Sequence, residues 1–294
     1  MPRGKIVKAL SGFYYVQDKE RLIQCRGRGV FRKNKITPLV GDEVEYQAEN
    51  DLEGYILEVF ERKNELVRPP ICNVDQAILV FSAVEPDFST TLLDRFLVLI
   101  EANDIIPIIV ISKVDLIPSE EIRERVGAFA KDYQNAGYTV LLTSTVESTV
   151  DKDLLPFLND HISVFAGQSG VGKSSLLNVL RPDLELKTND ISSHLGRGKH
   201  TTRHVELIPV GTGFVADTPG FSSLDFTGIE VEDLTYCFPE MRERSGDCKF
   251  RGCTHVREPK CSVKNAVEAG EIPQYRYDHY LTFVEEIKER KPRY

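Results

Sequence analysis

The chain has 294 residues, 41% hydrophobic and 28% charged, and its 37 Lys and Arg against 45 Asp and Glu give a net charge of −8. This composition predicts a globular chain with a sizeable core and two or three domains. The net charge argues against a uniformly basic nucleic-acid-binding surface, although a net value conceals local patches. No apolar run is long enough to span a membrane, and residues 1–10 lack the apolar core of a secretory signal. We therefore expect no membrane partner and a cytoplasmic location.

Residues 1–68 are predicted to form an OB-type β-barrel. Short strand-like runs are separated by Gly, Asp and Asn turn signals. Five strands in so few residues favour a small closed barrel. The strands are expected at Lys5–Leu10, Phe13–Gln17, Leu22–Arg26, Asp42–Gln47 and Gly54–Phe60. We expect a hinge at Arg68-Pro69-Pro70, where this domain ends.

Basic residues are concentrated between Arg21 and Lys35, where no acidic residue occurs. Such a run is either a solvated loop or a patch that contacts RNA. The RNA-binding candidates are Arg26, Arg28, Arg32, Lys33 and Lys35. Nearby aromatic side chains could stack on bases or belong to the barrel core, and these are Phe13, Tyr14, Tyr15 and Phe31.

Residues 69–229 are predicted to form an α/β domain, because apolar strands alternate with helices, which implies a parallel sheet covered on both faces. Strands are expected at Ala77–Ala83, Ile105–Ile111, Tyr138–Thr143 and Ile162–Ala166, and helices at Thr91–Ala102 and Ser119–Asn135. A hairpin-joined pair of strands is expected at His204–Val210 and Gly213–Ala216.

A phosphate-binding loop follows the strand Ile162–Ala166. Gly167, four further residues, Gly172, Lys173 and Ser174 fit the pattern G-x-x-x-x-G-K-[ST]. In this loop backbone N–H groups approach phosphate oxygens, Lys173 reaches the β- and γ-phosphates, and the Ser174 hydroxyl suits Mg²⁺. The alternative is an ordinary tight turn. The nucleotide-binding candidates are Gly167, Gln168, Ser169, Gly170, Val171, Gly172, Lys173, Ser174 and Ser175, with Lys173 also a catalytic candidate.

A second nucleotide motif is predicted at Asp217-Thr218-Pro219-Gly220, directly after an apolar strand. Asp217 is placed to hold Mg²⁺ directly or through water, and the Gly220 N–H could sense a γ-phosphate. The same four residues also fit an ordinary turn.

Two weaker motifs predict guanine as the base. In Ser112-Lys113-Val114-Asp115 the carboxylate can accept two hydrogen bonds that guanine donates and adenine cannot, and the lysine stem can cover the ring. This resembles the N-K-x-D motif of GTPases, with Ser112 where the motif has asparagine. Thr143-Ser144-Thr145 resembles the S-A-x motif, which makes Ser144 and Thr145 further candidates. Each motif alone could be an unremarkable loop at a strand end.

The final segment, residues 230–294, is predicted to be mainly helical and to bind metal. Cys248, Cys253, His255 and Cys261 have the spacing C-x₄-C-x-H-x₅-C. Three thiolates and one imidazole suit one structural Zn²⁺ per chain, because four protein ligands leave no open position. The alternative is four unrelated residues. The other cysteines, Cys25, Cys72 and Cys237, are expected to be buried free thiols.

The order of the motifs identifies a resemblance. The guanine motifs precede the phosphate-binding loop, whereas the loop comes first in an ordinary GTPase, so the sheet is predicted to be circularly permuted. With a barrel in front and a cysteine cluster behind, nearly the whole chain resembles the RsgA family of bacterial ribosome-assembly GTPases.

That resemblance implies GTP hydrolysis coupled to late maturation of the small (30S) ribosomal subunit and to release from it. It implies ribosomal RNA and guanine nucleotides as partners, Mg²⁺ with GTP, and a monomer. Phe221 follows the D-x-x-G motif and cannot orient water. The resemblance implies that a histidine of a switch loop positions the water, which makes His200 the catalytic candidate, and the alternative is a solvated histidine. Thr202 joins Ser174 and Asp217 as a Mg²⁺ candidate. The alternatives are an RNA-binding assembly module with a mainly structural guanine nucleotide, and a P-loop ATPase or kinase.

Overall fold

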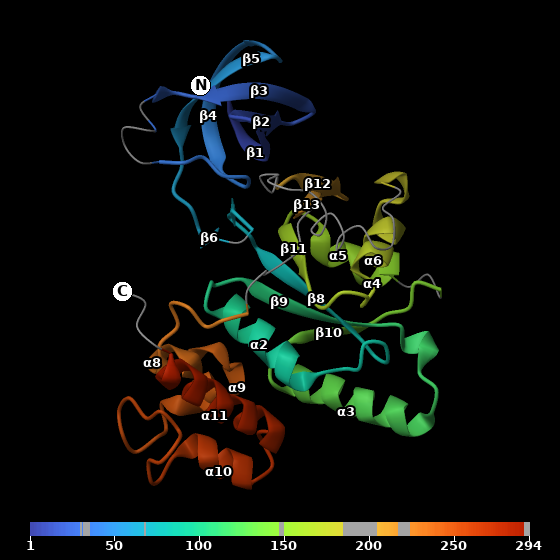
Figure 1. Ribbon diagram of the computed structural model, residues 1–294, viewed down its shortest axis with the longest axis vertical. Coiled ribbons are helices and arrows are strands. Elements are labelled where there is room, and N and C mark those ends of the chain that lie inside the picture. Colours follow the sequence, from blue (N-terminus) through green and yellow to red (C-terminus); the bar gives the residue numbers. More distant parts are fainter. Residues whose placement is uncertain are drawn as a thin grey trace. The chain divides into compact units, whose positions relative to one another are not determined.

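The structure is a computed structural model (Figure 1). It describes residues 1–29, 31, 36–67, 69–146, 150–184, 205–216 and 224–290. The chain forms two compact units, one of Met1–Ile78 with Thr145–Ser222 and the other of Leu79–Ser144 with Ser223–Tyr294. Each unit is discontinuous in sequence, and the domain boundaries 1–68, 69–229 and 230–294 remain a prediction. Within the described ranges, no helix is both long and apolar enough to cross a membrane.

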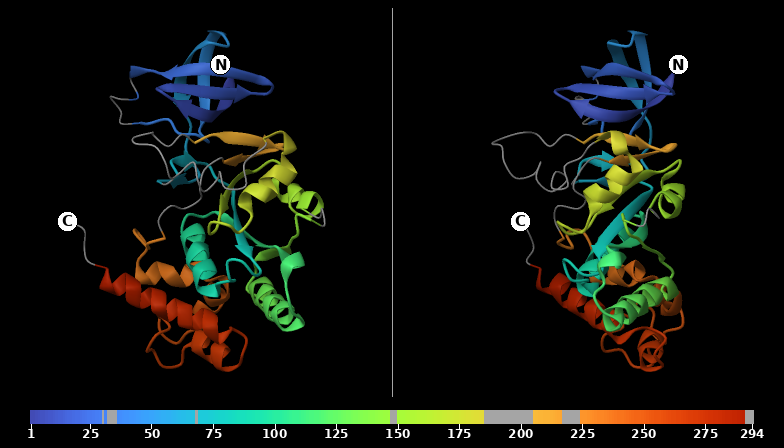
Figure 2. Two further views of the ribbon diagram at one scale, coloured as in Figure 1. Left: turned by 45° about the vertical axis from the view of Figure 1, so that its right-hand side comes forward. Right: turned by 90° about the vertical axis from the view of Figure 1, so that its right-hand side faces the viewer.

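The N-terminal part of the first unit is a closed five-stranded barrel, as predicted (Figures 1 and 2). Its strand order is β1-β2-β3-β5-β4, in which β3 and β5 run parallel and the other neighbouring pairs run antiparallel. Alternate side chains point inward and fill the barrel, which is the normal consequence of the two-residue period of a strand. The strands are β1 (Arg3–Leu10), β2 (Phe13–Asp18), β3 (Arg21–Gly27), β4 (Glu43–Asn50) and β5 (Glu53–Val59).

A short hairpin follows the barrel where the sequence predicts a hinge. Strands β6 (Glu65–Leu66) and β7 (Ile71–Cys72) pair antiparallel, and the turn between them contains the buried Pro69. The hinge prediction is wrong here, because the expected linker is tied back to the barrel. The Cys72 N–H donates to the Val40 carbonyl at 3.0 Å.

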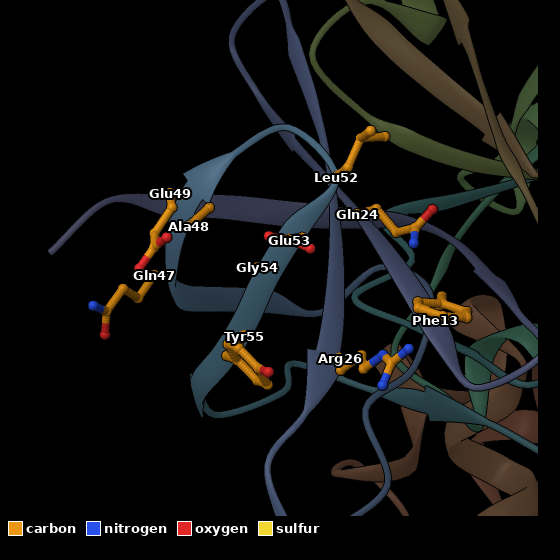
Figure 3. Close-up of a pocket in the computed structure, with 10 residues that line it drawn as sticks. All are labelled: Phe13, Gln24, Arg26, Gln47, Ala48, Glu49, Leu52, Glu53, Gly54 and Tyr55. Atoms are coloured by element: carbon orange, nitrogen blue, oxygen red, sulfur yellow. The ribbon is translucent and has the colours of Figure 1, made fainter.

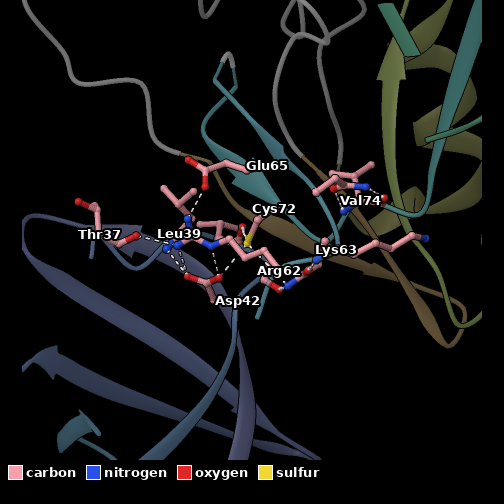
Figure 4. A network of polar contacts seen from close by, with 12 residues as sticks. Thr37, Leu39, Asp42, Arg62, Lys63, Glu65, Cys72 and Val74 are labelled. Carbon is pink, nitrogen blue, oxygen red and sulfur yellow. Dashed lines mark hydrogen bonds and ion pairs between the residues drawn. The ribbon is translucent and has the colours of Figure 1, made fainter. Parts of the chain in front are cut away.

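The buried carboxylate of Asp42 fastens this hairpin to the barrel (Figure 4). Arg62 donates to both Asp42 oxygens, at 2.7 and 2.8 Å, the Leu39 N–H donates at 2.7 Å, and the Cys72 thiol donates at 3.0 Å. A buried carboxylate is stable only when it is paired and hydrogen-bonded, so these partners fix the junction in one geometry.

The α/β part is a six-stranded sheet of order β10-β9-β8-β11-β13-β12. The pairs β10–β9 and β11–β13 are parallel and β12–β13 is the predicted antiparallel hairpin. Every residue of β8 and β11 is buried, as expected for the interior strands of a covered parallel sheet. The strands are β8 (Gln76–Ser82), β9 (Ile106–Ser112), β10 (Thr139–Leu142), β11 (Ile162–Ala166), β12 (Leu207–Val210) and β13 (Gly213–Ala216), and the helices are α2 (Thr90–Glu101), α3 (Glu120–Asn135), α4 (Val150–Asp153), α5 (Leu155–Leu158) and α6 (Lys173–Leu180).

The C-terminal segment is mainly helical, as predicted, and packs on α2 within the second unit. Its connection to α2 is a buried charge network: the Arg276 guanidinium donates to Asp94 and, at 2.8 and 3.0 Å, to both oxygens of Glu240. These three residues are at most 5% exposed. The elements are α8 (Val231–Leu234), η3 (Thr235–Cys237), α9 (Pro239–Ser245), α10 (Ser262–Glu268) and α11 (Gln274–Glu289).

The barrel junction leads to a stability prediction at Gly41. This glycine has φ +95°, and a Cβ there would lie 2.0 Å from the Cys72 carbonyl oxygen, whereas Gly12 has φ +83° with no atom within 4 Å of a Cβ. We expect Gly12→Ala to lower the free energy of unfolding by about 1 kcal/mol from backbone strain, and Gly41→Ala to lower it by roughly 3 kcal/mol or more. Urea unfolding followed by circular dichroism tests this, and equal losses would contradict the proposed close packing.

Candidate nucleotide and metal sites

The phosphate-binding loop joins β11 to α6 in the predicted way. Gly167, Gly170 and Gly172 have φ values of 136°, 82° and 98°, a region that other residues rarely adopt. Gly172 is the N-terminal cap of α6, and its carbonyl accepts the Leu176 N–H at 2.9 Å. The loop therefore ends at the positive end of the α6 dipole, which favours a bound anion.

Lys173 is folded back onto this loop. Its Nζ donates to the carbonyl oxygens of Gly167 at 2.8 Å and Gln168 at 2.6 Å, and the residue is 9% exposed. Burial lowers the pKa of Lys173 to about 8, because a buried ammonium loses the stabilisation of water. A phosphate at this loop would supply the negative partner that the two neutral carbonyls do not. Ser174 lies in the first turn of α6 and is 6% exposed.

The structure brings the two predicted guanine motifs together at the ends of β9 and β10. The Val114 N–H donates to the Thr143 carbonyl at 3.4 Å, and the Thr143 N–H donates to Ile111 at 2.8 Å. Ser144 is buried beside them, and Thr145 is exposed. The loops that follow β9 and β10 are far apart in the sequence but lie side by side in the structure.

Ser112 occupies the position where the N-K-x-D motif has asparagine. It is buried and donates to the Phe81 carbonyl on the neighbouring strand at 3.2 Å. Lys113 has a left-handed backbone, with φ 57°, and its Nζ donates to the Glu85 carbonyl. Asp115 follows in η1 (Val114–Leu116) with an exposed carboxylate, so the loop presents its acidic group to solvent.

Several predicted site residues lie outside the described residues. These are His200, Thr202, Asp217, Gly220 and Phe221, together with the RNA-binding candidates Arg32, Lys33 and Lys35. Arg26 (Figure 3) and Arg28 are described and exposed, whereas Phe31 is buried at 6% and does not offer its ring to a base.

Arg95 of α2 clamps the segment that leaves the D-T-P-G region. Its Nη1 donates to the Leu224 carbonyl at 3.0 Å and to Glu286 of α11 at 2.8 Å. The guanidinium also lies 4.6 Å from the ring centre of Phe226 and 5.0 Å from that of Phe283. Both ring contacts are in the range of cation–π attraction. No sequence motif signals this residue, because its partners are all distant in the chain.

Arg290, after α11, holds the same segment a few residues further on. It donates to the carbonyls of Phe226 and Ile229, the latter at 3.2 Å, and to the Glu230 carboxylate at 2.8 Å. The chain from Leu224 to Glu230 is therefore fixed to α2 and α11 by two guanidinium groups.

The four predicted metal ligands converge in the C-terminal segment. The ligand atoms of Cys248, Cys253, His255 and Cys261 all lie within 4.8 Å of one another. The distance is 3.9 Å between the sulfurs of Cys248 and Cys261, and His255 Nδ1 lies 3.6 and 3.2 Å from those two sulfurs. Tetrahedral zinc, with bonds of about 2.3 Å to sulfur and about 2.0 Å to nitrogen, requires separations of roughly 3.8 and 3.5 Å. This cluster could hold a metal ion, and Nδ1 is the His255 atom that faces the sulfurs.

Glu258 organises the loop between the ligands His255 and Cys261. It accepts hydrogen bonds from the N–H and hydroxyl of Thr254, both at 2.8 Å, and from the N–H groups of Val256 and Arg257 at 3.1 and 3.0 Å. Burial opposes its ionisation, but these hydrogen bonds prevail and lower the pKa of Glu258 to about 2. The spacing of the four ligands does not by itself indicate a role for Glu258, although this acidic residue lies between two of them in the sequence.

Comparison with known proteins identifies the family. The sequence model of the RsgA N-terminal domain matches residues 3–56, and that of the RsgA GTPase matches residues 59–227. The chain is 73% identical over 294 residues, and 100% of both chains, to a Bacillus cytotoxicus protein named small ribosomal subunit biogenesis GTPase RsgA. It is 67% identical over 298 residues, again 100% of both chains, to the Bacillus subtilis protein of that name.

Solved structures agree. The crystal structure of YloQ, described as a circularly permuted GTPase, matches with a TM-score of 0.88 and 62% identity, covering 100% of this chain and 97% of that chain. The fold and loops define a circularly permuted P-loop GTPase, and the chain belongs to the RsgA GTPase family. The family match supports GTP hydrolysis with Mg²⁺ and decides against the ATPase or kinase alternative.

The low pKa of Lys173 leads to a prediction for nucleotide binding. A bound phosphate favours the charged ammonium form of Lys173. Above about pH 8 Lys173 is mostly neutral in the free protein, so nucleotide binding there is accompanied by uptake of a proton. We expect the affinity for GDP to fall by up to about tenfold per pH unit between pH 8 and the higher pKa of the complex.

Isothermal titration calorimetry across this pH range measures the effect. Lys173→Arg is the control, because a guanidinium stays charged throughout and the pH dependence that remains belongs to other groups. The same pH dependence in both proteins would contradict the assignment to Lys173.

Proposed function

We propose that this chain is a GTP hydrolase that binds the small (30S) ribosomal subunit and couples GTP hydrolysis to late maturation of that subunit and to its own release. The observation that carries the proposal is the full-length similarity, at 73% identity, to a relative named for small ribosomal subunit biogenesis. Its working place would be the cytoplasm, where ribosomes assemble, and we propose that it acts as a monomer.

The nucleotide roles follow from the chemistry of the two loop systems. In this proposal Asp115 accepts the hydrogen bonds of guanine, Lys113 covers the ring, and the backbone at Ser144 and Thr145 faces the base carbonyl. The loop from Gly167 to Ser175 binds the phosphates, with Lys173 leaving its carbonyl partners for the β- and γ-phosphate oxygens. Two observations support these roles: the Asp115 carboxylate is exposed, and Lys173 is buried with a lowered pKa.

Hydrolysis would need both Mg²⁺ and an oriented water molecule. Mg²⁺ would neutralise the charge that develops on the phosphates, and we propose that Ser174, Thr202 and Asp217 hold it. Phe221 has no polar atom to orient water, so we assign this role to His200. We infer that turnover is slow until the ribosomal subunit orders the loop that carries His200.

GTP hydrolysis would be coupled to RNA binding by the N-terminal barrel and by the C-terminal segment. Arg95 and Arg290 fasten the segment after Gly220 to α2 and α11, so movement of the γ-phosphate sensor would act on the C-terminal segment. Arg26 and Arg28 on the barrel would contact ribosomal RNA, together with Arg32, Lys33 and Lys35. We propose that the cysteine cluster holds one structural Zn²⁺, because the ligand set and the sulfur and nitrogen separations fit it.

The function is tested by single-turnover GTP hydrolysis with and without purified small subunits. We expect slow hydrolysis alone and acceleration by on the order of tenfold or more when subunits are added, with both lost in Lys173→Ala. Asp115→Asn should transfer the preference from GTP to xanthosine triphosphate, because the amide can donate to the xanthine carbonyl. Equal rates with and without subunits would favour the alternative of an RNA-binding module with a structural nucleotide.

The zinc assignment is tested by elemental analysis of the purified chain. We expect one zinc per chain, and Cys261→Ser should lose the metal and lower the melting temperature of the C-terminal segment, because Cys261 is a buried ligand. Cys237→Ser is the matched control, since this buried thiol lies outside the cluster. Iron in place of zinc, or full metal content in Cys261→Ser, would contradict the proposal.

A further inference from the structure

The loop that carries the predicted metal ligand His255 is held by two tyrosines that are not themselves ligands. The Tyr277 hydroxyl donates to the His255 carbonyl at 2.6 Å, and the Tyr280 hydroxyl donates to the Thr254 carbonyl at 2.7 Å. Both tyrosines belong to α11, and both are buried. Two successive carbonyl groups of the loop are therefore bound by one helix.

The His255 side chain lacks the contact that usually orients a metal-binding imidazole. A ligating histidine normally donates its second ring N–H to a carboxylate, a carbonyl or water, and this hydrogen bond fixes the ring. Nδ1 of His255 lies 3.6 and 3.2 Å from the sulfurs of Cys248 and Cys261, so Nε2 is the second nitrogen. Nε2 is buried and has no hydrogen-bond partner among the residues that the structure describes. The orientation of this ring is therefore set by other contacts.

The two tyrosines supply those contacts. His255 has φ +60°, in the left-handed region that residues other than glycine rarely adopt, and such a backbone persists only where the surrounding structure holds it. The Tyr277 hydroxyl bonds to the carbonyl of this same residue. The Tyr280 ring packs against the imidazole, with 6.2 Å between the ring centres. Backbone and ring of His255 are thus both held in the orientation that directs Nδ1 at the sulfurs.

Helix α11 is itself fixed to α2, so the two hydroxyls come from a rigid support. Arg276 donates to one oxygen of the buried Asp94 carboxylate, and His279 Nδ1 lies 2.6 Å from the other. Residues three apart on a helix lie on the same face, and the rings of Tyr277 and Tyr280 are stacked with centres 6.4 Å apart. The metal loop is therefore preorganised by contacts that do not involve a metal.

We propose that Tyr277 and Tyr280 are positioning residues for the metal: they hold His255 ready to bind the ion and so set the affinity of a cluster to which they contribute no ligand atom. This inference rests on the proposed function, which places one structural Zn²⁺ at the cluster. If the hydroxyls only satisfied two buried carbonyls, they would stabilise the metal-free and metal-bound chains equally, and the metal affinity would not depend on them.

The experiment measures the Zn²⁺ affinity of the full-length chain by competition with a chromogenic chelator. Tyr277→Phe and Tyr280→Phe each keep the ring and remove only the hydroxyl. We expect each variant to bind Zn²⁺ roughly tenfold more weakly or worse, which is the usual effect of removing a group that orients a metal ligand. Tyr133→Phe is the matched control, because this buried hydroxyl donates to Asp94 at 2.7 Å, and it should bind Zn²⁺ like the parent chain.

Co²⁺ in place of Zn²⁺ reports on the coordination of the ion itself. The absorption spectrum of bound Co²⁺ depends on its ligands and geometry, so a loosely held imidazole should change the spectrum in Tyr277→Phe and leave it unchanged in Tyr133→Phe. Circular dichroism of the metal-free chains checks that each variant is folded. Equal Zn²⁺ affinity in Tyr277→Phe and the parent chain, or an equal loss in Tyr133→Phe, would overturn the positioning role.

GTP turnover with and without small subunits, measured on the same preparations, separates this inference from the proposed function. If subunits accelerate turnover while Tyr277→Phe binds Zn²⁺ like the parent chain, the positioning role is wrong and the proposed function stands. If Tyr277→Phe loses Zn²⁺ affinity while subunits have no effect on turnover, the positioning role stands and the coupling to the ribosome fails. A parent chain that binds no Zn²⁺ would overturn the metal assignment and the positioning role together.

Discussion

A single buried guanidinium, that of Arg276, holds the second unit together. Asp94 of α2 and Glu240 of α9 are buried carboxylates that would be strongly destabilising without a cation, and Arg276 of α11 satisfies both. These ion pairs connect helices α2, α9 and α11. Because α2 leads directly into β9 and the loop at Asp115, the C-terminal segment is fixed to the half of the sheet that carries the guanine motifs.

In the first unit, Asp42 is the buried carboxylate that needs a cationic partner. Its carboxylate joins the barrel to the hairpin after it, through Arg62 and Cys72. Further along, the Asp75 carboxylate accepts the Ile162 N–H at 2.8 Å, and the Asp75 N–H donates to the Ile162 carbonyl at 2.9 Å. Hydrogen bonds therefore connect the barrel to the hairpin and, a few residues further on, connect Asp75 to β11, the strand that ends at the phosphate-binding loop.

The residues that would contact ligands are thus mostly different from the residues that stabilise the packing of this chain. The side chains that would contact a ligand, such as Asp115, Arg26 and Arg28, are exposed at or near strand ends. The carboxylates of Asp42, Asp94 and Glu240, which fix the architecture, are buried and paired with arginine side chains. Lys173 has features of both groups, since it is buried, donates to two neutral carbonyl oxygens, and has a pKa that burial lowers to about 8. Such a perturbed group is typical of a binding site.

The sequence alone determined the elements whose signals are local. The glycine and lysine pattern of the phosphate-binding loop, the cysteine and histidine spacing, the five barrel strands and the permuted order could all be predicted, because each depends on residue types at short separations. The expected hinge at Pro69 was wrong for the same reason: proline predicts a turn locally, and only the contacts of distant Asp42 and Val40 make that turn part of a fixed hairpin.

Tertiary structure decided the rest. The clamp formed by Arg95 and the pairing of Arg276 with Asp94 both join residues from separate elements, and the parallel pairing of β3 with β5 has no local signature. Burial and strand register, which create these contacts, exist only once the chain has folded, so the sequence shows their residues without showing their partners.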